Sequence, residues 1–277
     1  MIDARTDAMA PQLPAPRRSL QGVNAPQRAA RSLAATSVGL AAGTLALLAV
    51  EAVVARTRPY LTPDSAPPIE GTYGDPEDVP LRLAVVGDST AAGVGVELTE
   101  DTVGAQVAAA IATDRRVILT CVAIAGSRTG DLGPQVSRAL LGRPDVVLML
   151  IGANDATHVT PLARVLAQQA TAVARLRAEG VAVIVGTCPD MGARNFLPPL
   201  RQLVAWQGRR VARIQDLAVR EADGDAVPLG LICGPQFRAD PDSLSEDGFH
   251  PSAYGYRLWT EALLPTVQRA VRVQTTR

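Results

Sequence analysis

Five short apolar runs alternate with longer segments of helical pattern, and this alternation limits the possible folds of the chain more than any other feature. The runs are nearly continuous in Val, Leu, Ile and Ala, as expected of strands covered on both faces of a sheet. They occupy residues 81–87, 116–124, 145–152, 181–187 and 226–232. The helical patterns lie near residues 101–113, 131–142, 161–178 and 196–222, and a last one follows Pro251. This alternation predicts a three-layer α/β/α domain around a five-stranded parallel sheet.

The part of the chain before this domain divides into three segments. Residues 1–31 are rich in Pro, Ala, Gln and Arg, have no apolar period, and are predicted to be a disordered cytoplasmic leader. Residues 32–50 carry no charge, and a helix of that length rises about 28 Å, close to the ~30 Å apolar core of a bilayer. Residues 32–55 are therefore predicted to be a transmembrane signal anchor. Residues 56–80, with six prolines, are predicted to be an extended linker to the domain at residues 81–272.

Four of the arginines in the leader, at positions 17, 18, 28 and 31, lie closest before the uncharged run. By the positive-inside rule they keep the N-terminus in the cytoplasm, so the C-terminal domain is expected outside it. Two alternatives compete with the anchor. The run is either a buried core helix, although it has no polar face, or a signal peptide cleaved near Ala55, which would release a secreted domain. The apolar run is longer than the usual core of a signal peptide, which favours the uncleaved anchor.

The composition excludes some classes of function. The 27 basic residues balance the 27 acidic ones, whereas a nucleic-acid-binding protein normally shows a basic excess. The cysteines, Cys121, Cys188 and Cys233, stand far apart with no CxxC pair and no partner-His spacing, so no metal site is expected from them. In an exported domain Cys188 and Cys233 are a candidate disulfide, which the sequence leaves open. The stretch GDSTAAGVG matches neither nucleotide-binding fingerprint.

Polar residues follow the first three apolar runs and precede the last helical pattern. In open parallel sheets, ligands bind in the crevice beyond the carboxyl ends of the strands, so these groups are expected to share one crevice. The groups are GDST at 87–90, AGS at 125–127, GAND at 152–155 and DGFHP at 247–251.

These four blocks, in this order, resemble those of the SGNH (GDSL-like) hydrolase family over about residues 81–272. The segments GTCPD and HPSAYGY are also similar to exported actinobacterial members. The resemblance implies the flavodoxin-like SGNH fold and an esterase or lipase-type enzyme without a cofactor. One departure is Thr90, where the motif that names the family has Leu.

The resemblance implies that Ser89 is the nucleophile, and elementary chemistry agrees. A serine hydroxyl is a poor nucleophile until a base takes its proton. The chain has only two histidines, His158 and His250. His250 is favoured as the base because Asp247, three residues earlier, is able to hold its ring and stabilise the imidazolium.

Attack on an ester creates an oxyanion, which needs hydrogen-bond donors already in place. The resemblance supplies three donors, namely the Ser89 N–H, the Gly126 N–H and the Asn154 side-chain amide. Because the next helical pattern begins only near residue 101, the segment after Ser89 is expected to be a turn that exposes the hydroxyl. Asp88 and Asp155 are expected to organise loops as hydrogen-bond acceptors.

The sequence therefore predicts a serine hydrolase that cleaves carboxylic esters of small-molecule, lipid or glycan substrates. One alternative is an acyltransferase or O-deacetylase that acts on cell-envelope glycans or glycolipids. Another is a non-catalytic module that binds glycans or lipids. Neither the acyl chain nor the alcohol part of the substrate is set by the sequence.

Overall fold

The computed structural model describes residues 30, 42–55 and 57–275. The chain divides into two compact units, Met1–Leu47 and Leu48–Arg277. Residues 42–55 are helical. Within the described ranges no helix is both long and apolar enough to cross a bilayer. Residues 31–41, which hold most of the first half of the predicted anchor, and nearly all of the predicted leader lie outside these ranges.

The described part of the chain contains a sheet of six strands in the order β1-β3-β2-β4-β5-β6. Their bounds are β1 Gly71–Tyr73, β2 Pro80–Gly87, β3 Arg116–Cys121, β4 Val146–Leu150, β5 Ala182–Gly186 and β6 Asp225–Val227. Five strands are parallel, and β1 pairs antiparallel with β3. The prediction of a five-stranded, purely parallel sheet was therefore wrong by one strand. β1 escaped notice because a three-residue strand is too short to show the period of two on which strand prediction rests.

The last predicted strand was wrong in its second half. β6 ends at Val227, and residues Leu229–Ile232 form the short helix α7 instead. Pro228 separates them, and a proline has no N–H with which to continue a ladder. A short apolar run does not by itself distinguish a buried strand from a buried helix.

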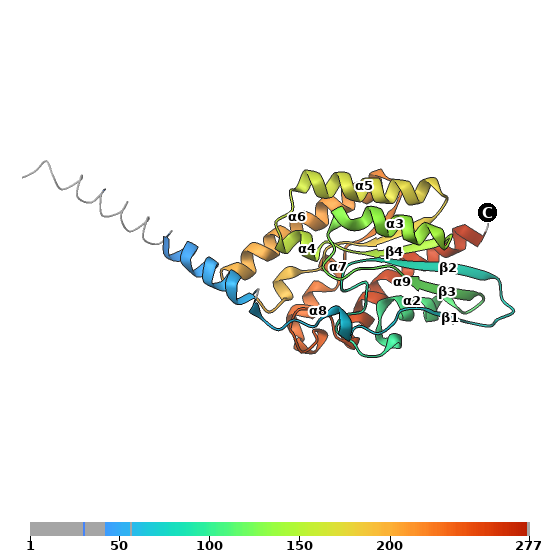
Figure 1. Ribbon diagram of the computed structural model, residues 1–277, viewed down its shortest axis with the longest axis horizontal. Coiled ribbons are helices and arrows are strands. Elements are labelled where there is room, and N and C mark those ends of the chain that lie inside the picture. Colours follow the sequence, from blue (N-terminus) through green and yellow to red (C-terminus); the bar gives the residue numbers. More distant parts are fainter. Residues whose placement is uncertain (1–29, 31–41, 56, 276–277) are drawn as a thin grey trace, which may run out of the picture. The chain divides into compact units, whose positions relative to one another are not determined.

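Helices cover both faces of the sheet (Figure 1). One face packs on α2 and α9, the other on α3, α5 and α6. The larger helices are α2 Val103–Ile111, α3 Leu132–Leu141, α5 Leu162–Ala178, α6 Leu200–Glu221 and α9 Ala253–Thr275. The other short helices are α4 Ala153–Thr157 and α8 Gly234–Ala239, with single turns of 3₁₀ helix at Pro63–Ser65, Thr99–Asp101, Thr129–Asp131, Met191–Ala193 and Pro241–Ser243. The predicted three-layer α/β/α arrangement is confirmed.

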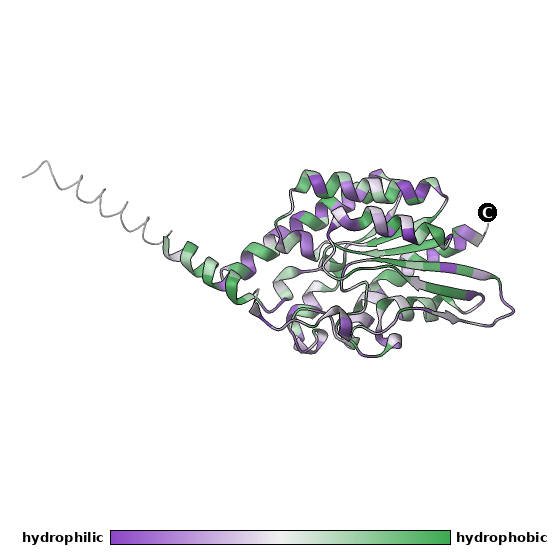
Figure 2. Cartoon of the chain, viewed as in Figure 1, coloured by the Kyte–Doolittle hydropathy of each residue, from purple (hydrophilic) through white to green (hydrophobic). Residues whose placement is uncertain are grey.

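The core follows the alternation of side chains along each strand. In β2, Leu83 and Val85 pack toward α2 and α9, whereas Ala84 and Val86 pack toward the opposite layer. Figure 2 shows the central strands as mostly hydrophobic and the helices as mixed, as expected for strands buried on both faces. The largest fully buried side chain is Trp259 in α9, which with Tyr256 and Phe237 adds aromatic rings to a mostly aliphatic core.

The order of the parallel strands positions the candidate site. It runs β3-β2-β4-β5-β6, which is the flavodoxin-like order with its reversal between β2 and β4. Ligands of such sheets bind at this reversal. Ser89 follows β2 and Asn154 follows β4, so both residues lie at the expected crevice.

The three cysteines are all free thiols. Cys188 and Cys233 are buried and make no disulfide with one another, which answers the question that the sequence left open.

Candidate active site

Ser89 lies in a turn that begins where β2 ends. Gly87 has φ = +142°, and a Cβ on this residue would overlap the carbonyl oxygen of Leu150, so only glycine fits here. The side-chain amide of Gln135 accepts from the Gly87 N–H at 2.8 Å and donates to its carbonyl at 3.0 Å. The turn expected after Ser89 is present, and α2 begins only at Val103.

Asp88 organises this turn, as predicted. Its Oδ1 accepts from the Thr90 N–H at 2.9 Å and from the Thr90 hydroxyl at 2.8 Å. Burial raises the pKa of Asp88, and the two hydrogen bonds from Thr90 offset only part of that effect. The side chain points into the fold and leaves Ser89 as the accessible member of the turn.

The structure brings Ser89, His250 and Asp247 into one line of contacts. The Nε2 atom of His250 lies 3.0 Å from the Ser89 Oγ, although the residues are 161 positions apart. The Nδ1 atom of His250 lies 2.6 Å from the Asp247 Oδ2. Only 6% of the His250 side chain and 2% of the Asp247 side chain are exposed. Ser89, His250 and Asp247 thus have the geometry of a serine hydrolase triad.

The carboxylate of Asp247 is held by its own turn. Its Oδ1 accepts from the Ser245 hydroxyl at 2.9 Å and from the N–H groups of Phe249 and His250 at 2.8 and 2.9 Å. Its Oδ2 also accepts from the Leu61 N–H at 3.2 Å. Burial acts to raise the pKa of Asp247, but the hydrogen bonds from His250 and Phe249 outweigh it and hold that pKa well below its usual value. Asp247 is therefore a stable anion opposite the imidazole.

Close contacts join the turn that contains Ser89 to the segment that contains His250. Gly95 has φ = +112°, and a Cβ on it would overlap the Pro251 carbonyl oxygen. The buried Tyr256 hydroxyl donates to the Val94 carbonyl at 2.7 Å. Both contacts connect the stretch after Ser89 to the segment that follows His250, so they hold the two residues close together.

The three predicted oxyanion donors differ in their hydrogen bonding. In the described part of the chain, the N–H groups of Ser89 and Gly126 donate to no acceptor. Asn154 Nδ2 donates one hydrogen to the Ser127 carbonyl at 3.1 Å, which orients the amide and leaves its second hydrogen uncommitted. Two free N–H groups and one oriented amide are the donor set that a developing oxyanion requires.

Buried polar side chains fix the loops that carry these donors. Asp155 accepts from the Thr129 N–H at 2.9 Å and from its hydroxyl at 3.0 Å, as expected of a loop organiser. Burial raises the pKa of Asp155. Gln215 of α6 accepts from the Cys188 N–H at 2.7 Å and donates to the Ile151 carbonyl at 3.0 Å, which ties the ends of β4 and β5 together.

The second histidine does not face the serine. His158 ends α4, is exposed, and its Nδ1 lies 2.9 Å from the Asn154 carbonyl oxygen. Among the described residues, the only histidine in contact with Ser89 is His250.

Two further contributors to the site carry no signal in the sequence. Leu61, from the segment predicted to be a linker, donates its N–H to Asp247. Arg194 is 2% exposed and its guanidinium lies 5.0 Å from the ring centre of Phe249, the neighbour of His250. Its two terminal nitrogens have no hydrogen-bond partner among the described residues, and burial lowers its pKa. One arginine among 27 basic residues has no pattern that would identify it.

Sequence comparisons relate the chain to a known family of proteins. The chain matches the GDSL-like lipase/acylhydrolase family over residues 85–258. It is 37% identical over 245 residues to a GDSL-like esterase from Mycobacterium tuberculosis, an alignment that covers 83% of this chain and 78% of that protein.

Two solved structures share the architecture. A lipase/acylhydrolase from Enterococcus faecalis is 21% identical with a TM-score of 0.53, and the match covers 68% of this chain and 95% of that one. An acetyl xylan esterase from Geobacillus stearothermophilus is 20% identical with a TM-score of 0.53, over 69% and 95% of the two chains. At these identities the likeness shows the fold alone. The family match and the identity to the mycobacterial esterase show more: the chain belongs to the GDSL-like lipase/acylhydrolase (SGNH) family of ester-hydrolysing enzymes.

Proposed function

We propose that the protein hydrolyses carboxylic esters through an acyl-enzyme on Ser89. His250 takes the proton of the Ser89 hydroxyl as the oxygen attacks the ester carbonyl. The same proton then passes to the departing alcohol. Water, activated by His250, releases the acid and restores the serine. The observation that supports this proposal most strongly is the 3.0 Å contact between the His250 Nε2 and the Ser89 Oγ.

The remaining site residues orient the imidazole of His250 and stabilise the charges that form during the reaction. Asp247 holds the imidazole with its Nε2 free to accept the proton and stabilises the imidazolium that forms. The N–H groups of Ser89 and Gly126 and the amide of Asn154 donate to the oxyanion of the tetrahedral intermediate. Support comes from the 2.6 Å contact between Asp247 and His250 and from the uncommitted hydrogens of the three donors.

The test is labelling with a fluorophosphonate together with the hydrolysis of nitrophenyl esters. Wild-type protein should lose its activity as one phosphonyl group is added to the Ser89 peptide. Ser89→Ala should be neither labelled nor active, whereas Ser137→Ala, at an exposed position in α3, should behave like wild type. Labelling elsewhere, or more than a few per cent of wild-type rate in Ser89→Ala, would refute the mechanism.

Acyl transfer would use the same acyl-enzyme, with a sugar hydroxyl in place of water. A run of acceptor sugars added to the ester assay separates the two outcomes, because transfer yields an acylated sugar and lowers the yield of free acid.

We also propose that residues 32–55 anchor the protein in a membrane with the domain on the outer side. The proposal rests on the charge-free run at 32–50 and on the arginines that precede it.

A further inference from the structure

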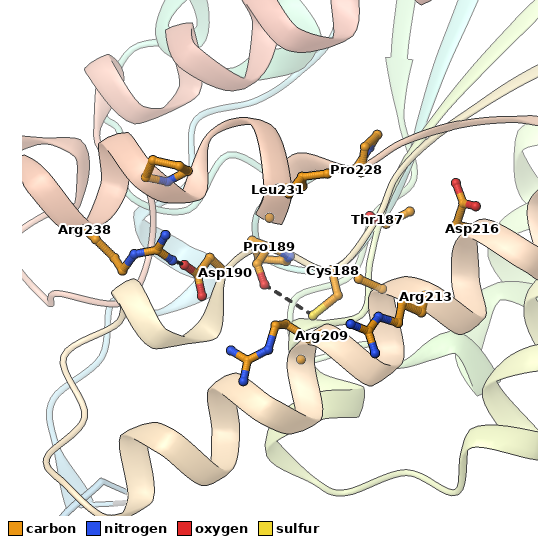
Figure 3. A pocket seen from close by; sticks show the side chains of 14 residues that line it. Thr187, Cys188, Pro189, Asp190, Arg209, Arg213, Asp216, Pro228, Leu231 and Arg238 are labelled. Atoms are coloured by element: carbon orange, nitrogen blue, oxygen red, sulfur yellow. Dashed lines mark hydrogen bonds and ion pairs between the residues drawn. The ribbon is translucent and has the colours of Figure 1, made fainter.

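We propose that the same domain carries a second binding site for an anionic amphiphile, a carboxylate or phosphate monoester with an apolar chain. The site is a cavity of about 590 Å³ beyond the ends of β5 and β6, between α6 and the segment that contains α7 and α8 (Figure 3). This volume is typical of small-molecule sites. The lining residues include none of those proposed for ester cleavage.

One wall of the cavity is positively charged. Arg209 and Arg213 lie one turn apart on α6, and Figure 3 shows both on the same side of the cavity. Neither guanidinium group forms a hydrogen bond or an ion pair with any described residue. Like charges four residues apart on a helix repel one another, so an anion bound between them relieves the repulsion. Guanidinium groups bind carboxylate and phosphate oxygens in pairs, which suits either headgroup.

The acidic residues of the lining do not neutralise this pair. Asp190 forms an ion pair with Arg238. Asp216 pairs with Arg220 at 3.0 Å, on the next turn of α6. Both carboxylates are therefore engaged with other arginines, and the uncommitted charge of the cavity is that of Arg209 and Arg213.

A buried hydroxyl adds a polar contact. Thr187, directly after β5, is 1% exposed, and its Oγ1 has no hydrogen-bond partner in the described part of the chain. Most buried polar groups in proteins are hydrogen-bonded. Because the Thr187 Oγ1 has almost no accessible surface in this structure, we infer that its side chain turns to meet an oxygen of the bound ligand.

The opposite wall is apolar. Figure 3 shows Pro228 and Leu231 across the cavity from the two arginines. The side chain of Leu231 is exposed although it is large and apolar, with 78% of its surface accessible. A bare anion would leave this wall uncovered, and a neutral chain would leave the arginines without a partner. The combination selects a molecule with both an anionic head and an apolar chain.

Calorimetric titration of the full-length protein with decanoate and with decyl phosphate, at low salt and below micelle formation, tests the site. Both ligands should bind, and decanol and inorganic phosphate should bind at least about tenfold more weakly, since each lacks one half of the recognition. Arg209→Gln with Arg213→Gln should raise the dissociation constants at least about tenfold. Leu231→Ser should weaken both decyl ligands and leave inorganic phosphate unchanged.

Arg210→Gln is the matched control, because Arg210 lies between the two arginines but stacks on Trp206 at 4.4 Å and does not line the cavity. Equal losses in this variant and in the double variant would overturn the site. So would decanoate binding that disappears once Ser89 carries a phosphonyl group, because the ligand would then occupy the ester-cleaving crevice. The double variant should keep wild-type esterase activity. The proposed hydrolysis is tested separately by the Ser89 variant, so failure of one proposal is distinguishable from failure of the other.

Discussion

Replacing Asp247 by asparagine changes one atom of the proposed triad. The surrounding hydrogen bonds determine which way the new side-chain amide is oriented. The Oδ1 atom of Asp247 accepts from two backbone N–H groups and the Ser245 hydroxyl. An amide group placed there would leave two fixed donors without an acceptor, at a cost of about 1–3 kcal/mol each. The amide oxygen of the introduced asparagine therefore takes the Oδ1 position, and its NH₂ faces the Nδ1 atom of His250.

An NH₂ donor at that position forces His250 into the wrong tautomer. Its Nδ1 must then accept, so the proton moves to Nε2 and points at the Ser89 hydroxyl, which His250 no longer deprotonates. Loss of the orienting acid in a triad lowers kcat by roughly 10³–10⁴. The Leu61 N–H also loses its acceptor. Together with the loss of a charge-assisted bond this costs about 2 kcal/mol of stability, or a fall in Tm of about 4–8 °C.

The assay is kcat/KM for a nitrophenyl ester, with Tm followed from pH 7 to pH 3. Because the folded-state pKa of Asp247 is lowered, its stabilising effect is complete above the unfolded pKa of about 3.9 and is lost as the pH falls below it. The difference in Tm between wild type and Asp247→Asn should therefore shrink below about pH 4. Glu246→Gln, at an exposed neighbouring position, should match wild type. A variant Asp247→Asn with a tenth or more of wild-type kcat/KM would refute the tautomer argument.

Three further predictions test other parts of the molecule. Asn154→Ala should lower kcat by roughly 10²–10³ with little change in KM, and a large rise in KM at unchanged kcat would instead make Asn154 a substrate-binding residue. Burial raises the pKa of Cys121 to about 11, so iodoacetamide at pH 8 should alkylate it more than about 100-fold more slowly in the folded than in the unfolded protein, because only the thiolate reacts; equal rates by mass spectrometry would contradict the burial. A phosphatase reporter fused after Pro80 should be active in a bacterial host and one fused after Arg31 inactive; the opposite result would overturn the proposed topology.

Much of the fold could be predicted from the sequence, because most of its strands and helices show a pattern within their own residues. The apolar runs that became β2, β4 and β5 are buried on both faces, and their composition alone marks them as central strands. The prediction of a strand at residues 226–232 was wrong in its second half, because the apolar run Leu229–Ile232 suits a buried helix as well as a buried strand. The strand β1 was missed because it is defined by its pairing with β3, which lies far away in the sequence, and three residues show no strand pattern of their own.

The residues of the candidate site also differ in whether a local sequence motif identifies them. Ser89 and His250 stand in short motifs, and the chain offers only two histidines, so their partnership was predictable. The Leu61 N–H was not predictable, since any residue except proline supplies the same backbone donor. Arg194 was not predictable either, because its burial beside Phe249 follows from the path of the loop between β5 and α6.

The separation of 161 residues between Ser89 and His250 has a consequence for the newly made protein. Translation delivers the N-terminal part of a domain first, whereas the domain itself generally folds as one unit. The serine turn and its neighbouring strands emerge early, whereas Asp247 and His250 precede only α9, whose residues Trp259 and Leu263 complete the core. In the proposed mechanism, a nascent chain that already contains Ser89 therefore still lacks the base that would activate it. If the proposed mechanism holds, hydrolysis requires the complete domain, so an unfinished or truncated polypeptide would not cleave the esters of the cell that makes it.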